Sequence, residues 1–137
     1  MLALVDAGYA VSLPFGENTR YDLIIDDGRT LDRVQCKTGH MRFGAVVFPT
    51  ASSYAHHPNP KQRRRHYLGQ VDSFAVYCPP LSTVYLIPIS DLPLDRATLR
   101  VTPARNHQRK RIRDAAAYEL AKVEIVRPSR VMRDGGV

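Results

Sequence analysis

The stretch from residue 21 to residue 39 constrains the fold more than any other part of the chain, because it has the pattern of a β-hairpin. Two arms rich in aliphatic and β-branched residues flank Asp26, Asp27 and Gly28, residue types that are typical of a tight turn. A helix expected at residues 1–7 would lead into a mixed sheet that contains this hairpin, which is an α/β arrangement.

The second arm of the hairpin carries two polar side chains on one face. Side chains alternate along a strand, so Gln35 and Lys37 should project together, and Val34 and Cys36 should project from the opposite face. Gln35 and Lys37 are therefore predicted to be neighbours.

The length of the loop decides whether Asp22 joins them. A two-residue loop at 27–28 places Asp22 opposite Arg33 and diagonal to Gln35, whereas a four-residue loop at 27–30 places Asp22 directly opposite Gln35. Both lengths put the three polar groups on one face. A loop of odd length would turn Asp22 to the other face.

Two interpretations of this polar face are open. Asp22, Gln35 and Lys37 could form the solvated side of an ordinary hairpin, which is the commoner outcome for such residues. Alternatively, a carboxylate, an amide carbonyl and an ammonium group converge in an otherwise apolar hairpin, where a sheet packed on a core would not accommodate them. The second interpretation predicts a functional site.

The spacing of the three residues also resembles a known active-site pattern. Gln35 follows Asp22 by thirteen positions and Lys37 follows Gln35 by two, which resembles the PD-(D/E)XK nuclease superfamily with Gln in place of its second acid. Flanking segments, in order along roughly residues 1 to 125, resemble the branch that contains group I intron homing endonucleases. These segments are 8–11, 20–23, 34–39, 71–78 and 84–88.

This resemblance implies an α/β fold of the restriction-endonuclease type, with a central mixed β-sheet flanked by helices. The length of 137 residues indicates one nuclease-like domain over residues 1–137. It implies a metal-dependent endonuclease that hydrolyses the phosphodiester bonds of double-stranded DNA. Asp22 and Gln35, with the backbone carbonyl of Cys36, would hold Mg²⁺, for which Mn²⁺ could substitute. Lys37 would lie beside the attacking water and neutralise the phosphate.

The chain departs from this pattern in two respects. Gln35 removes one negative charge from the site, so a protein that binds nucleic acid without cutting it is the alternative function. The N-terminal helix of the resembled family normally carries a Glu that completes the metal site, whereas the helix expected at residues 1–7 has only Asp6, close to its end. We expect either that Met1 is an internal start or that Glu17 in the following loop takes over the role.

The distribution of charge is consistent with a polyanionic partner. The net charge is +7, but residues 1–39 hold four basic and six acidic groups, for −2, and the remainder holds sixteen basic and seven acidic groups, for +9. Basic runs occupy a long loop at 50–70 and a second loop at 105–113; a solvated, mobile insertion is the other interpretation of the first. The residues predicted to contact DNA are Arg42, Ser52, Ser53, Tyr54, Lys61, Arg63, Arg64, Arg65, Arg109, Lys110 and Arg111.

The remaining features indicate a protein of the cytoplasm. No apolar run approaches the length of a membrane span, and the first residues lack a signal peptide, so no membrane partner is expected. Cys36 and Cys78 are interpreted as small buried hydrophobes rather than a disulfide. Cutting both DNA strands also predicts a homo-oligomer. Further strands are expected at 9–13, 45–48, 71–77, 83–89 and 99–102, helical turns at 90–93 and 115–120, and a frayed tail at 127–137.

Overall fold

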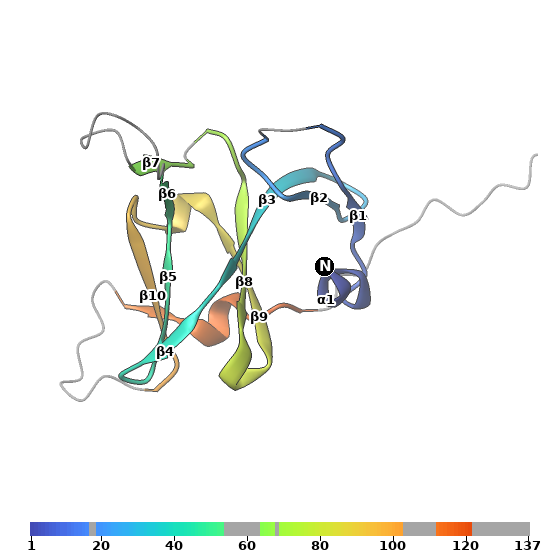
Figure 1. The fold of residues 1–137 in the computed structure, drawn as a ribbon. Coiled ribbons are helices and arrows are strands. Elements are labelled where there is room, and N and C mark those ends of the chain that lie inside the picture. Colours follow the sequence, from blue (N-terminus) through green and yellow to red (C-terminus); the bar gives the residue numbers. More distant parts are fainter. Residues whose placement is uncertain (17–18, 54–63, 68, 103–111, 122–137) are drawn as a thin grey trace, which may run out of the picture.

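The computed structural model describes residues 1–16, 19–53, 64–67, 69–102 and 112–121 (Figure 1). Strands dominate this part of the chain. The helical elements are the α-helix α1 (Leu2–Asp6) and the 3-10 turns η2 (Pro79–Leu81), η3 (Ile89–Asp91) and η4 (Ala115–Tyr118). The strands are β1 (Ala10–Ser12), β2 (Leu23–Asp26), β3 (Leu31–Thr38), β4 (His40–Arg42), β5 (Ala45–Pro49), β6 (Ala51–Ser53), β7 (Arg64–His66), β8 (Ser73–Cys78), β9 (Thr83–Pro88), β10 (Arg96–Arg100) and β11 (Arg113–Asp114).

These strands form two larger sheets and one small one. The first sheet has the order β1-β2-β3-β8-β9, the second has the order β11-β10-β5-β4, and β6 pairs only with β7. Both larger sheets are mixed, because β3 runs parallel to β8 and β10 runs parallel to β11 while the other pairs are antiparallel. In Figure 1, β3 crosses the middle of the molecule and leads directly into β4, so one nearly continuous segment joins the two larger sheets.

Two apolar cores lie on opposite faces of the first sheet. One face packs against the second sheet, and this core contains Phe74 and Val76 of β8 together with Val46 and Phe48 of β5. The other face is covered by Leu4 of α1, which packs with a smaller cluster from β2, β3 and β8. The alternation of side chains along β3 therefore separates an α1-facing row from a row that faces the second sheet.

Gly39 lies where the chain passes from one sheet to the other. Its N–H donates to the carbonyl of Tyr77 at 2.8 Å, and a Cβ atom at this position would lie 2.5 Å from Cγ1 of Val46 and 3.1 Å from Cγ1 of Val76. Only a residue without a side chain allows the backbone to approach the intersheet core this closely.

We predict that Gly39→Ala lowers the free energy of unfolding by about 1–3 kcal/mol, because the added methyl group overpacks the core. Urea unfolding of Gly39→Ala, Val46→Ala and the double variant measures the effect. Since Val46→Ala removes the contacted methyl groups, the double variant should lose less than the sum of the single losses. Strict additivity would show that the methyl group of residue 39 does not meet Val46.

The structure refines several expectations from the sequence. The predicted hairpin and the strands near 9–13, 45–48, 71–77 and 83–89 are present, and β10 begins at Arg96 rather than Leu99. Flanking helices are only weakly represented, since the described residues contain the single five-residue helix α1 and short 3-10 turns. Strands β4, β6, β7 and β11 were not expected, and β6 and β7 occupy part of the segment that was predicted to be a loop. Among the described residues, no helix is long and apolar enough to span a membrane.

Candidate active site

The turn of the central hairpin fixes the register of its two strands. Asp26 pairs with Leu31, which leaves four residues in the loop. The Asp27 side chain accepts hydrogen bonds from the N–H groups of Arg29 at 2.8 Å and Thr30 at 2.9 Å, and these bonds to Thr30 and Arg29 lower the pKa of the Asp27 carboxyl. Of the loop lengths considered above, the four-residue one is therefore formed.

Asp22 immediately precedes β2 and lies against β3. Leu23 pairs with Val34, the last pair of this ladder, and an unbroken register would place Asp22 level with Gln35. The ladder shifts here, because the Asp22 N–H donates to the carbonyl of Val34 at 2.9 Å. The Asp22 carboxylate in turn accepts the N–H of Cys36 at 2.8 Å through Oδ2. Asp22 is thereby held beside the residue that separates Gln35 from Lys37.

Gln35 and Lys37 lie on the opposite face of β3 from Val34 and Cys36. Their register partners on β8 are Phe74 and Val76, which belong to the core between the sheets, and both polar side chains are half-buried. Nζ of Lys37 lies 5.3 Å from the ring centroid of Tyr67. The predicted neighbours on β3 thus share the face that looks toward the second sheet.

The oxygen atoms around Asp22 suit a weak site for a hard cation. Among the described residues, Oδ1 of Asp22 and the side chain of Gln35 make no hydrogen bond, and Asp22 is exposed. The N–H and C=O of one residue point to the same edge of a strand. Since the Cys36 N–H faces Asp22, the Cys36 carbonyl faces the same edge. No cluster of three His, Cys, Asp or Glu side chains that could hold a metal ion occurs in the described part of the chain, and Gln35 contributes no charge.

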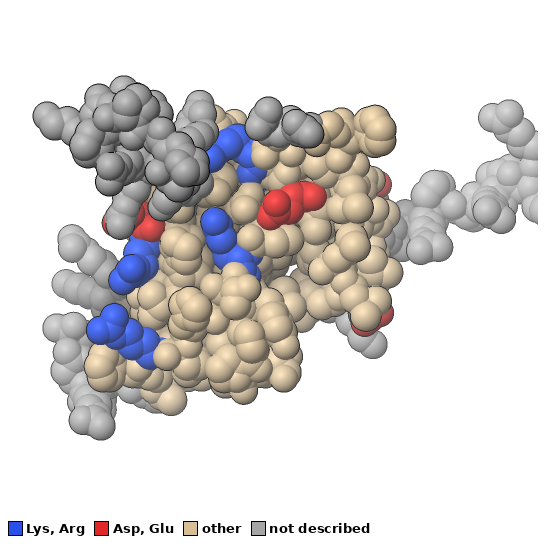
Figure 2. Space-filling view, viewed as in Figure 1, with Lys and Arg blue, Asp and Glu red and all other residues tan. Residues whose placement is uncertain are grey.

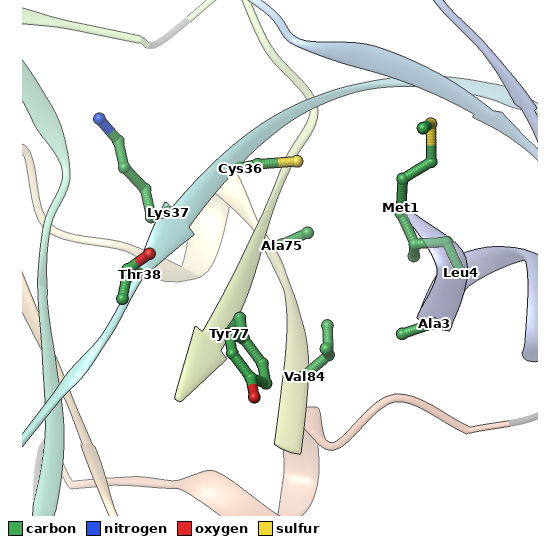
Figure 3. Close-up of a pocket in the computed structure, with 9 residues that line it drawn as sticks. All are labelled: Met1, Ala3, Leu4, Cys36, Lys37, Thr38, Ala75, Tyr77 and Val84. Atoms are coloured by element: carbon green, nitrogen blue, oxygen red, sulfur yellow. The ribbon is translucent and has the colours of Figure 1, made fainter. Parts of the chain in front are cut away.

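The Cys36 side chain points away from these groups into an apolar hollow. The hollow has a volume of about 230 Å³, and Figure 3 shows Met1, Leu4, Ala75 and the Cys36 thiol around it, with the Lys37 side chain directed elsewhere. Burial, followed by the charge of Asp22, raises the pKa of the Cys36 thiol. Cys36 therefore remains a neutral thiol, and any role at the site belongs to its backbone. Both cysteines are free, as expected.

An ion pair near the start of β3 fixes β3 against β8. Arg33 donates to Asp72 from Nε at 3.1 Å and from a terminal nitrogen at 3.2 Å, and the Arg33 backbone N–H donates to the same carboxylate at 2.7 Å. These bonds lower the pKa of Asp72, with the Arg33 side chain as the largest cause. The pair holds the strand that carries Gln35 and Lys37 in register with β8.

We predict that Asp72→Asn lowers the free energy of unfolding at pH 7 by about 1 kcal/mol, a modest value because both side chains are 39% exposed. The folded-state pKa of Asp72 lies below its ordinary value of 3.8, so this stabilisation is present above that pH and is lost as the pH falls through the folded-state pKa. Urea unfolding at pH 7 and pH 3 should show a difference from wild type that shrinks in acid. The control is Asp6→Asn, on the exposed side of α1. A difference that is as large at pH 3 as at pH 7 would contradict the ion pair.

The structure describes the predicted DNA contacts only in part. Arg42 is exposed at the end of β4 and lies 5.5 Å from the ring of Phe43, an exposed residue at the hairpin tip. Arg42 and Arg96 also line a hollow of about 470 Å³ on the second sheet. Ser52 and Ser53 lie in β6, and Arg64 and Arg65 lie in β7. Tyr54, Lys61, Arg63, Arg109, Lys110 and Arg111 lie outside the described residues, as do Glu17 and the tail at 127–137.

Basic side chains gather on the face that carries this site. Figure 2 shows lysine and arginine side chains spread from the junction of the two larger sheets across the second sheet, next to an acidic group. Arg20 and Tyr67 also belong to this local arrangement, although they were not predicted as site residues. Cζ of Arg20 lies 4.0 Å from the centroid of the Tyr67 ring, the ring that Lys37 also approaches. The position of Arg20, two residues before Asp22, was the signal that could have identified it.

Comparison with known proteins decides the family. A family model described as PD-(D/E)XK endonuclease matches residues 1–121. The chain belongs to the PD-(D/E)XK endonuclease family. A solved structure, the bacterial homing endonuclease I-Ssp6803I, is similar with a TM-score of 0.65 and 24% sequence identity, over 86% of this chain and 79% of that protein. At this identity, the likeness shows a shared fold. No curated protein matches the sequence.

Proposed function

We propose that this PD-(D/E)XK family member is a metal-dependent endonuclease that hydrolyses phosphodiester bonds of double-stranded DNA. The observation that carries the proposal is the 2.8 Å hydrogen bond from the Cys36 N–H to Asp22. This bond places a carboxylate against the segment that contains Gln35 and Lys37. The family match and the homing-endonuclease fold support the same activity.

The residues around Asp22 suit Mg²⁺, or Mn²⁺ in its place. Asp22 would contribute a carboxylate oxygen, Gln35 its amide carbonyl and Cys36 its backbone carbonyl. When bound, the cation would supply a water of lowered pKa and a positive charge beside the phosphate. Mg²⁺ retains several waters and needs few protein carboxylates when a substrate phosphate is present. Because Gln35 is neutral, the site should therefore fill mainly when DNA is bound.

The chain's own residues would perform three tasks. Asp22 and Gln35 orient the phosphate and the attacking water beside β3. The Lys37 ammonium neutralises charge that develops on the phosphate and stabilises the attacking hydroxide. Arg42 and the basic segments near residues 61–65 and 109–111 hold the DNA backbone and fix its position without reading its sequence. We also propose a symmetric oligomer, because cutting both strands requires two active sites.

A second candidate function is DNA binding without cleavage. The observation that favours it is the neutral side chain of Gln35 beside Lys37, together with the lack of a cluster of three His, Cys, Asp or Glu side chains within the described residues. The two candidates make different predictions for one supercoiled plasmid incubated with the protein. An endonuclease nicks or linearises the plasmid in Mg²⁺ and not in EDTA, whereas a binding protein retards it in a gel and leaves it intact in both buffers.

A further inference from the structure

Two cationic side chains share the ring of Tyr67. Cζ of Arg20 lies 4.0 Å from the ring centroid and Nζ of Lys37 lies 5.3 Å from it. Because both distances start at one point, the two cationic centres are at most about 9 Å apart and repel each other. The negative face of an aromatic ring offsets part of this repulsion. An anion that contacts both groups would offset the remaining repulsion between them.

The ring and the guanidinium are both held in place. Tyr67 is 4% exposed, and its ring meets Phe74 edge to face at 5.3 Å. Nε of Arg20 donates to the side-chain oxygen of Gln70 at 2.5 Å, and the Gln70 N–H donates to the carbonyl of Tyr67 at 2.9 Å. Tyr67 thus supplies the ring beneath the Arg20 guanidinium, and Gln70, in the same turn, supplies the amide that fixes the orientation of the guanidinium. Such fixation reduces the conformational entropy lost when a ligand binds.

The two cations come from the two chain segments that the hydrogen bond between Cys36 and Asp22 joins. Arg20 lies two residues before Asp22, and Lys37 directly follows Cys36, whose N–H binds the Asp22 carboxylate. A phosphate held beside Asp22 through a cation would therefore lie next to the two segments that carry these basic side chains. A guanidinium has a planar fork that matches two phosphate oxygens, whereas an ammonium acts as a point charge.

We propose that Arg20 is a further catalytic residue that contacts the scissile phosphate, and that Tyr67 is a positioning residue that aligns Arg20 with Lys37. This inference rests on the proposed nuclease function. Arg20 would bind the non-bridging oxygens, whose negative charge increases as the attacking oxygen approaches, while Lys37 would act at the attacking water.

The test is single-turnover cleavage of a labelled DNA duplex at saturating protein, with the dissociation constant measured in EDTA and the melting temperature measured in parallel. Arg20→Gln should lower the rate about 10²-fold, with the dissociation constant changed by less than about threefold and melting close to wild type. Arg20→Lys should recover only part of this loss, because it restores the charge without the planar fork. The matched control is Arg29→Gln, an exposed arginine in the turn of the same hairpin, which should cleave at the wild-type rate.

Variants of the ring test its positioning role. Tyr67→Phe retains the aromatic face and should cleave about tenfold faster than Tyr67→Leu, which removes it. Equal rates for these two variants would overturn the positioning role. Cleavage by Arg20→Gln at the wild-type rate, while Lys37→Ala is inactive, would overturn the role of Arg20 and leave the nuclease function standing. If the wild-type chain did not cleave DNA at all, the nuclease function and this inference would fail together.

Discussion

Lys37→Ala should lower the single-turnover rate of DNA cleavage by about 10²–10⁴-fold while changing the affinity for duplex DNA by less than about threefold. The reason is its position. Its ammonium lies 5.3 Å from the centroid of the buried Tyr67 ring, on the half-buried face of β3 next to Gln35. Lys37 is also one of twenty basic residues, so its removal only slightly weakens the overall electrostatic attraction to a polyanion.

Cleavage of an end-labelled duplex at saturating protein measures the rate, and fluorescence anisotropy in EDTA measures the affinity. The control is Lys122→Ala, which removes a lysine with no assigned role and should change neither quantity. A Lys37→Ala protein that binds tenfold more weakly but cuts at the wild-type rate would make Lys37 a simple DNA contact.

Asp22→Asn should reduce cleavage in Mg²⁺ by about 10³-fold, with part of the loss recovered in high Mn²⁺, which is expected to tolerate the neutral amide oxygen better than Mg²⁺. The Asn side chain can still accept the Cys36 N–H, so the local backbone is expected to stay in place. Only the charge that would hold the cation is removed. The loss should therefore appear in the rate and its metal dependence and not in the melting temperature.

Asp26→Asn is the matched control for this variant. Oδ1 of Asp26 accepts the Gly28 N–H at 2.7 Å in the same hairpin, and an Asn there keeps this acceptor as well. The two substitutions remove the same charge at different ends of β2. Similar losses for both variants would show that charge on the hairpin, rather than a ligand at Asp22, is what the activity requires.

The hairpin and its alternating faces could be predicted because they depend on local chemistry. Asp26, Asp27 and Gly28 specify a turn, and the period of two along β3 separates Gln35 and Lys37 from Val34. The loop length could not be predicted, because it depends on hydrogen bonds that the Asp27 side chain makes to two backbone groups of the turn. Both of these interactions are individually weak, and several turn types compete at this point.

Long-range contacts could not be predicted from the sequence. Tyr67 follows a stretch without periodicity, so nothing local indicated that its ring would be buried under Arg20, 47 positions earlier in the chain. Pairing of β6 with β7 was missed for the same reason, since three-residue strands carry too little pattern to be recognised. The passage of the chain between the sheets at Gly39 likewise depends on Val46 and Val76, which lie far along the sequence.

The most direct test of the central claim is cleavage of a supercoiled plasmid by the wild-type chain and by Lys37→Ala, purified in parallel by the same procedure. We predict nicked or linear DNA from the wild-type protein in Mg²⁺, intact DNA in EDTA, and intact DNA from Lys37→Ala in both buffers. Parallel purification matters because a contaminating nuclease would be present in both preparations. Intact plasmid with the wild-type protein in Mg²⁺, or equal cutting by both proteins, would contradict a nuclease site built on Asp22, Gln35 and Lys37.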